Sequence, residues 1–186
     1  MYDHLLFATS NDHKYKEAKS FFQSINVNIK HLRIEYTEIQ NDSLEKISKY
    51  SVIDVSNAHS GTIFVEDSGL FIETLNGFPG PYSSYVNSTI GPEGIINLLN
   101  GSKNRSAYFL SVIALAQNGK LTAIFKGKVK GSISEELRGH NGFAFDVCFI
   151  PHEFQSTFAE MTLIEKNQIS HRRKSMEKLA QHLNHK

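Results

Sequence analysis

The chain has 186 residues, 40% hydrophobic and 21% charged, which is typical of a globular protein that buries its core without disulfides. The formal net charge of +1 excludes a strong overall field for attracting nucleic acid or an anionic membrane. Cys148 is the only cysteine, so an intrachain disulfide is excluded, and its apolar neighbours predict a buried side chain. Because no signal peptide or membrane-spanning apolar run is recognisable, we expect a cytoplasmic protein with one domain over residues 1–186.

The N-terminal segment predicts a strand, a polar loop and a helix. Residues 4–9 are a short apolar run. Helical spacing then gives one apolar face, formed by Tyr15, Ala18, Phe22 and Ile25. Glu17 lies outside this face. The loop T-S-N-D-H-K, the helix N-terminus and Lys14 together favour an anion. The glycines of a Walker A loop are missing, however, and a plain turn capped by Asn11 or Asp12 is the commoner explanation.

Two segments place carboxylates where strands are predicted to end. Residues 31–39 alternate polar and apolar, which predicts a half-buried strand with Glu38 near its end. Residues 62–66 are a second apolar run, predicted to end at Glu66 and Asp67 before a Ser-Gly turn. Acidic groups at the mouth of a buried strand need a partner, and both a metal ion and a structural hydrogen-bond network remain open. Glu38 by itself also fits a solvated edge charge.

The central part of the chain predicts two helices and a β-hairpin. The capping-box pattern D-S-L-E predicts a helix that runs to about Ala58, and residues 91–99 predict a short helix. Residues 106–117 predict an apolar strand and 120–129 a returning strand with its lysines in solvent. Asn118-Gly119 between them is a strong hairpin signal.

The C-terminal third combines a glycine–phenylalanine loop with a basic helix start. Residues 139–151 read G-H-N-G-F-A-F-D-V-C-F-I-P, which suits a flat ring, and we expect a strand to begin at Asp146. Basic residues gather around Ser170, at or before the first turn of the predicted last helix: Lys166, His171, Arg172, Arg173 and Lys174. Positive charge there opposes the helix dipole and costs up to about 1 kcal/mol unless an anion compensates. A solvated basic turn and an anion site both remain open.

These features together favour one class of ligand. Carboxylates without a zinc-like spacing of His and Cys suit Mg²⁺ rather than zinc. The basic groups suit phosphates, and the glycine–phenylalanine loop suits a purine. A magnesium nucleotide is the ligand that uses all of these features.

Four segments, in this order and separation, carry a family resemblance: A-T-S-N-D-H-K (8–14), T-E-I-Q (37–40), V-E-D-S-G-L with G-F-P-G-P-Y-S (65–83), and G-F-A-F-D through S-H-R (142–172). The chain resembles the inosine triphosphate pyrophosphatases, also called XTP/dITP diphosphatases, over nearly its whole length. The resemblance implies a homodimer with an elongated α/β fold, in which the active cleft lies between two lobes of a twisted mixed sheet. It also implies Mg²⁺-dependent hydrolysis of ITP, dITP and XTP to the monophosphate and pyrophosphate. No nucleic-acid or membrane partner is expected.

The resemblance also assigns residue roles. It makes Glu38 and Asp67 the magnesium ligands, with Asp67 also the catalytic base, and Glu66 a structural neighbour. The implied substrate contacts are Thr9, Ser10, Asn11, Lys14, Ser68, Phe143, Ala144, Phe145, Asp146, Lys166, His171 and Arg172. Among them Phe143 stacks on the base, Lys166 reaches phosphate or base, and His171 and Arg172 approach the 6-oxo group.

The base loop departs from the family pattern. It reads G-F-A-F-D where G-F-G-Y-D-P is usual, so Ala144, Phe145 and Val147 put the degree of base selectivity in question. Two alternatives therefore stand beside the pyrophosphatase. One is a non-catalytic nucleotide-binding protein on the same scaffold, and the other is a pyrophosphatase for modified pyrimidine triphosphates.

Overall fold

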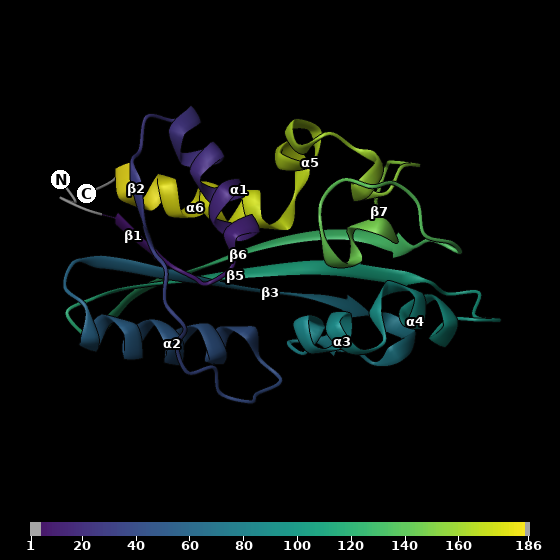
Figure 1. Ribbon diagram of the computed structural model, residues 1–186, viewed down its shortest axis with the longest axis horizontal. Helices are drawn as coiled ribbons and strands as arrows, with labels where there is room; N and C mark the ends of the chain where they lie inside the picture. Colours follow the sequence, from purple (N-terminus) through teal and green to yellow (C-terminus); the bar gives the residue numbers. More distant parts are fainter. Residues whose placement is uncertain (1–4, 185–186) are drawn as a thin grey trace. The chain divides into compact units, whose positions relative to one another are not determined.

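The computed structural model describes residues 5–184 and has an α/β fold with a mixed seven-stranded sheet (Figure 1). The strands are β1 (Leu5–Ala8), β2 (Ile29–Leu32), β3 (Thr62–Ile72), β4 (Pro79–Gly80), β5 (Ser106–Gln117), β6 (Lys120–Ile133) and β7 (Phe149–Pro151). The α-helices are α1 (Asp12–Ser24), α2 (Leu44–Ala58), α3 (Ser83–Thr89), α4 (Gly91–Leu98), α5 (Leu163–Ile169) and α6 (His171–Asn184). Short 3₁₀ helices are η1 (Glu73–Leu75), η2 (Ala144–Val147) and η3 (Phe158–Glu160). Across residues 5–184, every helix is too short or too polar to cross a bilayer.

The strand order is β2-β1-β3-β5-β6-β7, with β4 paired to β3. β1 runs parallel to both neighbours, with Leu5 opposite Ile29 on β2 and opposite Thr62 on β3. β4 and β7 are antiparallel to β3 and β6. Because parallel strands end at the same edge of a sheet, the chain leaves β1 and β2 at one place. The loop after β1 therefore begins beside the segment that follows β2.

The described chain divides into two compact units. Unit 1 comprises residues 5–67, 111–127 and 172–184, and unit 2 comprises residues 68–110 and 128–171. Strands β3, β5 and β6 contribute residues to both units. The expectation of a single domain over the whole chain stays a prediction.

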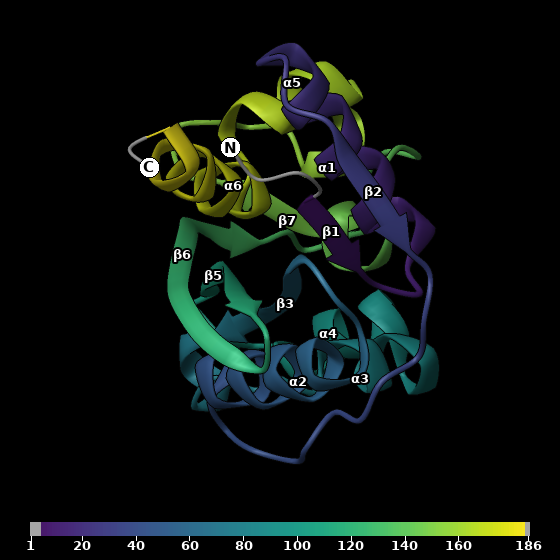
Figure 2. The same ribbon diagram turned by 90° about the vertical axis from the view of Figure 1, so that its left-hand side faces the viewer.

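In unit 1, α1 and α6 cover one face of the strands and α2 covers the other (Figures 1 and 2). The rings of Phe7 and Phe64 stack at 4.5 Å between centroids, and Phe22 of α1 packs against them. Leu179 of α6 is fully buried in the same cluster. The predicted strand at 4–9, the helix after it and the helix to Ala58 are confirmed, although His4 lies outside the described residues.

Unit 2 has its own aromatic core. Phe109, Phe149 and Phe158 contact one another, with ring centroids 4.7 to 6.1 Å apart. Cys148 lies in this core as a free, fully buried thiol, as predicted, and burial raises its pKa to about 12. A thiol with so high a pKa has almost no thiolate at neutral pH, so it acts as a small apolar side chain.

The predicted strand over residues 31–39 is wrong beyond Leu32, where β2 ends. Residues 33–41 have no regular secondary structure, so Glu38 does not lie at a strand end. Ile34 and Tyr36 pack against an apolar cluster that contains Val55 of α2. The alternation of this segment therefore reports one-sided packing, which does not require the ladder hydrogen bonds of a sheet.

The predicted Ser-Gly turn after Asp67 is also wrong, because β3 continues without a break to Ile72. A Cβ at Gly69 would lie 2.2 Å from the carbonyl oxygen of Gly80 on the paired strand β4. The glycine therefore permits close approach of two backbones, which is the usual reason for a glycine inside a strand. Glu66 and Asp67 are interior residues of β3.

The strand predicted to begin at Asp146 begins only at Phe149. Asp146 lies in η2, where its carboxylate accepts a hydrogen bond from the N–H of Phe143 at 2.8 Å. This side-chain bond closes a tight turn. The apolar residues that followed Asp146 in the sequence are divided between that turn and the short strand β7.

Candidate active site

The loop between β1 and α1 is held by its own side chains. Thr9 Oγ1 accepts a hydrogen bond from the N–H of Asn11 at 3.1 Å. Asn11 Oδ1 accepts from the N–H groups of His13 and Lys14, so Asn11 is the cap of α1 and Asp12 is its first residue. Ser10 is exposed. The loop thus presents exposed backbone at a helix N-terminus, an arrangement that favours anions.

Lys14 connects this loop to β3. Its Nζ donates to the carbonyl oxygen of Glu66 at 2.9 Å and lies 3.1 Å from Glu66 Oε2. The lysine side chain is 16% exposed, so its charge remains near the surface beside the loop. One cation is therefore fixed at the start of α1 without being sealed in the interior.

Lys14, Glu17, Glu66 and Arg172 form what we call the buried charge cluster of unit 1. Arg172 pairs with Glu17 through Nη1, and its Nε lies 3.2 Å from Glu66 Oε1. The exposed fractions of Glu17, Glu66 and Arg172 are 6%, 1% and 2%. Burial by itself would lower the pKa of Arg172, but Glu66 and Glu17 raise that pKa above its ordinary value. The guanidinium remains charged inside the fold.

This cluster corrects the helical face expected for α1. Glu17 was placed outside that face, yet it is buried, because Arg172 of α6 supplies a charge for it. The positive charge at the start of α6 is compensated by two carboxylates of the protein. Glu66 has the structural surroundings that were expected of it.

Ser111 and Ser175 complete the surroundings of Glu66, and sequence reasoning missed both. Ser111 Oγ donates to Glu66 Oε1 at 2.7 Å and lies 2.8 Å from Ser175 Oγ. Ser175 Oγ in turn donates to the carbonyl oxygen of Arg172 at 2.9 Å. The only sequence signal was a hydroxyl residue inside the otherwise apolar strand over 106–117.

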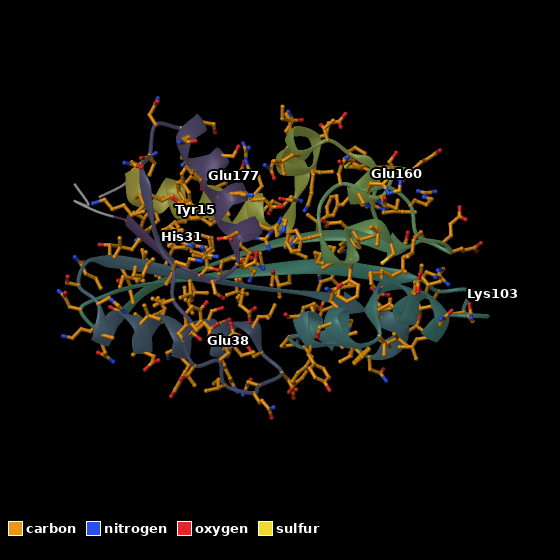
Figure 3. All side chains as sticks on the ribbon, viewed as in Figure 1. Tyr15, His31, Glu38, Lys103, Glu160 and Glu177 are labelled. Atoms are coloured by element: carbon orange, nitrogen blue, oxygen red, sulfur yellow. The ribbon has the colours of Figure 1, made fainter. Side chains whose placement is uncertain are left out.

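The two carboxylates expected to bind metal lie on different kinds of backbone. Glu38 is exposed on the irregular segment that leads to α2 (Figure 3), and Asp67 is half-buried on β3. Burial raises the pKa of Tyr36 well above its ordinary value, and Glu38, Asp67 and Glu66 raise it further. The negative potential of all three carboxylates therefore reaches one phenol.

Glu38 and Asp67 offer oxygen ligands of the kind that Mg²⁺ prefers. Within residues 5–184, no group of three or more His, Cys, Asp or Glu residues is arranged to hold a metal. Mg²⁺ is commonly bound by one or two carboxylates together with substrate phosphates, and it keeps several waters. Glu38 and Asp67 match that mode better than a cage made of protein ligands alone.

In unit 2, Asp146 and Lys166 form a sealed ion pair. Lys166 Nζ lies 2.7 Å from Asp146 Oδ2, and the two side chains are 3% and 4% exposed. The same oxygen accepts from the N–H of Phe143, and Lys166 Nζ lies 4.9 Å from the centroid of the Phe143 ring. The pair therefore fixes both the backbone and the ring of Phe143.

The residues around Phe143 have an unusual backbone. Gly142 and Ala144 both have positive φ, +77° and +52°. Ala144 thus keeps the left-handed conformation for which glycine is preferred, at a cost of roughly 1 kcal/mol. Phe145 is 1% exposed and belongs to the core of unit 2. His171 is also buried, and its ring stacks on Phe109 at 4.6 Å.

The expected site residues are divided between the two units. In unit 1 they are Thr9, Ser10, Asn11, Lys14, Glu38, Asp67 and Arg172. In unit 2 they are Ser68, Phe143, Ala144, Phe145, Asp146, Lys166 and His171. Ser68 is half-buried and follows Asp67 directly on β3.

Comparison with known proteins shows which family this chain belongs to. A model of the Ham1 family matches residues 5–182. The chain belongs to the Ham1 family. It is 47% identical over 177 residues to a dITP/XTP pyrophosphatase of Methanopyrus kandleri, covering 95% of this chain and 94% of that protein. It is 49% identical over 176 residues to a dITP/XTP pyrophosphatase of Thermococcus kodakarensis, covering 95% of each.

Solved Ham1 structures have the same α/β fold. A HAM1 protein from Coxiella burnetii gives a TM-score of 0.87 at 26% identity, covering 98% of this chain and 99% of that one. The Staphylococcus aureus Ham1 protein gives 0.84 at 28% identity, covering 98% of each chain. The family expected from the four sequence segments is confirmed.

Proposed function

We propose that this Ham1 family chain hydrolyses dITP, XTP and ITP to the nucleoside monophosphate and pyrophosphate in the presence of Mg²⁺. The observation that carries the proposal is the identity of 47% and 49%, over 95% of the chain, with two proteins named dITP/XTP pyrophosphatase. The chain is accordingly a hydrolase of nucleotide metabolism, a nucleoside triphosphate diphosphatase.

The phosphate half of the proposed site consists of residues of unit 1. In the loop, Thr9 binds phosphate oxygens through its hydroxyl, Ser10 through its N–H and hydroxyl, and Asn11 through its side-chain amide, because the N–H groups of Thr9 and Asn11 already donate within the protein. Lys14 adds a full positive charge. Glu38 and Asp67 would hold Mg²⁺, which supplies neutralisation of phosphate charge. Asp67 accepts a proton from the attacking water and orients that water. Phosphoryl-type cleavage depends mainly on positioning and charge stabilisation, so this set of groups suffices.

The base half consists mainly of residues of unit 2. Phe143 stacks on the purine, held by the Asp146–Lys166 pair, while Ala144 and Phe145 shape the loop. The resemblance assigns Lys166, His171 and Arg172 to the 6-oxo group or to phosphate, and Ser68 to a substrate contact. All three of the former are buried, with Lys166 and Arg172 in ion pairs of the protein, so the proposal places the substrate against groups that these pairs hold. A buried donor facing the amino group of adenine would be left unsatisfied at a cost of about 1–3 kcal/mol. This difference favours oxo-purines.

The shape, the oligomeric state and the location of the protein also stay predictions. The resemblance implies an elongated, two-lobed molecule with its active cleft between the lobes, and a homodimer. The sequence implies a cytoplasmic location.

The proposal is tested by measuring pyrophosphate release from dITP, XTP and ITP against dATP, dGTP and modified pyrimidine triphosphates. We expect at least about tenfold higher kcat/KM for dITP, XTP and ITP than for dATP, whose 6-amino group mismatches the donor. dGTP has the same 6-oxo group, so its rate tests whether the 2-amino group is also discriminated. Release of orthophosphate, or equal rates on all purines, would contradict the proposal. Nucleotide binding without turnover would favour a binding protein, and a preference for pyrimidines would favour the other alternative.

The role of Asp67 has a separate test. Asp67→Asn should lower kcat by at least about 100-fold, the range expected for loss of a general base. Circular dichroism checks that the variant stays folded. Asp54→Asn, which changes an exposed carboxylate on α2, is the control and should retain activity. Near-normal turnover of the Asp67 variant would show that the assignment is wrong.

A further inference from the structure

His31 lies directly behind the proposed phosphate loop. Its Nε2 is 2.9 Å from the carbonyl oxygen of Thr9. Its ring stacks on Tyr15 of α1, with centroids 3.9 Å apart and planes 10° from parallel. Figure 3 shows the two side chains next to one another, one from β2 and one from α1. No part of the mechanism above uses either residue.

The tautomer of His31 follows from its hydrogen-bond partner. A carbonyl oxygen only accepts hydrogen bonds, so Nε2 carries the hydrogen and the imidazole is the donor. The stack on Tyr15 holds the ring in the plane that this bond requires. Two neighbouring elements, β2 and α1, therefore act on one peptide group of the loop.

The hydrogen bond from His31 Nε2 to the Thr9 carbonyl takes the place of a backbone hydrogen bond that the sheet lacks here. Thr9 N–H donates to the carbonyl oxygen of Leu32 at 3.1 Å, which continues the parallel ladder between β1 and β2 by one step. β2 ends at Leu32, so the next backbone N–H of the ladder is not supplied to the Thr9 carbonyl. The side chain of His31 supplies that donor. Both backbone groups of Thr9 are thus fixed against β2.

Fixing the Thr9 carbonyl also fixes the N–H of the next residue. The Thr9–Ser10 peptide is trans, so its C=O and N–H point in opposite directions in one plane. With the carbonyl turned toward His31, the Ser10 N–H is turned away from it. Ser10 is exposed, and within residues 5–184 its N–H donates to no protein acceptor. The N–H is therefore oriented for an external anion.

We propose that His31 is a positioning residue, which holds the Thr9–Ser10 peptide so that the Ser10 N–H binds a phosphate oxygen of the substrate, with Tyr15 holding the imidazole. The inference rests on the proposed function only in naming nucleotide phosphate as the anion. The orientation of the peptide itself is independent of it. Loss of the imidazole donor frees the peptide to rotate, and rotation would turn the Thr9 carbonyl oxygen toward the phosphates.

The central experiment compares His31→Phe with His31→Gln. Phenylalanine keeps an aromatic ring to stack on Tyr15 and removes the donor, whereas glutamine supplies an amide N–H at a similar reach. We expect His31→Phe to raise KM for XTP about tenfold with kcat nearly unchanged, because a phosphate contact present in ground and transition states is lost. His31→Gln should recover most of that increase. Asp54→Asn, which changes an exposed carboxylate on α2 outside this contact, is the control and should behave like the unchanged protein.

Nuclear magnetic resonance of the amide groups gives a readout that does not depend on turnover. The Ser10 ¹⁵N–¹H resonance should shift on addition of inorganic triphosphate in the unchanged protein and much less in His31→Phe. Equal KM values for all variants, equal increases for Phe and Gln, or an identical Ser10 response in His31→Phe would overturn the inference. If the unchanged protein releases no pyrophosphate from XTP, the proposed function fails, and the Ser10 response still decides the role of His31.

Discussion

Unit 1 and unit 2 each seal charged groups inside the fold, but they satisfy these groups in different ways. In unit 1, Glu66 is shared by Lys14, Arg172 and Ser111, and Arg172 is shared by Glu66 and Glu17. In unit 2, Asp146 pairs with Lys166 and accepts a hydrogen bond from the N–H of Phe143. The first arrangement connects α1, β3, β5 and α6, whereas the second connects one loop to α5.

The difference shows what each arrangement is able to fix. A shared carboxylate sets the relative position of several elements. Its removal takes an ion-pair partner from both Lys14 and Arg172, although Arg172 keeps Glu17. The Asp146–Lys166 pair joins η2 to α5, and Asp146 also keeps the N–H of Phe143 when the lysine is lost. Because an uncompensated buried charge costs several kcal/mol, the two arrangements should respond differently to the loss of one member.

Glu66→Gln should have the largest effect on stability. The change leaves Lys14 and Arg172 without a shared anion, and we expect unfolding free energy to fall by about 3–5 kcal/mol. Urea denaturation followed by circular dichroism measures it. The control is Glu177→Gln, which breaks an exposed pair with Arg173 and should cost less than about 0.5 kcal/mol. A loss below about 1 kcal/mol for Glu66→Gln would remove the distinction between the units.

Lys166→Met should have the next largest effect, about 2–3 kcal/mol, because it takes this cation from the buried Asp146 carboxylate, which still accepts from the Phe143 N–H. The double variant with Asp146→Asn sharpens the test. It removes the buried charge altogether, so it should be more stable than Lys166→Met alone. The same denaturation experiment applies, and a double variant less stable than the single one would show that the carboxylate is not the source of the cost.

Ala144 tests the backbone that the unit 2 pair holds in place. Ala144→Val adds a β-branched side chain at a φ of +52° and should lower the unfolding free energy by about 1–2 kcal/mol. Ala144→Gly should change it by less than about 1 kcal/mol, because relief in the folded loop is offset by a freer unfolded chain. Thermal unfolding measures both, and a neutral valine variant would show that the loop is not strained there.

Glu160, an exposed carboxylate, should have the smallest effect on stability. Its pKa is lowered below the ordinary 4.5, first by the hydrogen bond from Thr157 N–H at 2.7 Å and then by nearby Arg138. A folded-state pKa below the unfolded one means that this stabilisation is complete above pH 4.5 and is lost as pH falls through the lowered value. Glu160→Gln should therefore flatten the dependence of stability on pH below that point.

The measurement for Glu160 is urea denaturation at a series of pH values from neutral to about 3, the range over which such a carboxylate titrates. Glu135→Gln changes another exposed carboxylate of unit 2 and is the control. Unchanged pH dependence in the Glu160 variant would show that the cap does not contribute to stability.

Much of the fold could be predicted from local sequence signals. The strand Ser106–Gln117, the turn at Asn118-Gly119 and the helix that ends at Ala58 all agree with their predictions. Each of these segments specifies its structure locally, through apolar periodicity, a turn residue or a cap. The family was equally accessible, because its four segments keep their order along the chain.

Burial against distant elements could not be predicted in this way. Glu17 was expected on the outer face of α1 and is buried, because Arg172 arrives from a helix 155 residues further along the chain. Glu38 was expected on a strand, yet its segment lacks a ladder partner. Periodicity reports which side of a segment faces the interior, but not which group covers that side.

The sequence alone determined many of the elements, the family and the identity of the chemical groups, because propensity, capping and periodicity are properties of neighbouring residues. Only the tertiary structure decided which charges are sealed together, where β3 continues, and that His31 completes the ladder behind the loop after β1. Those features depend on pairing between segments far apart in the chain, for which a carboxylate or an imidazole carries no local signal.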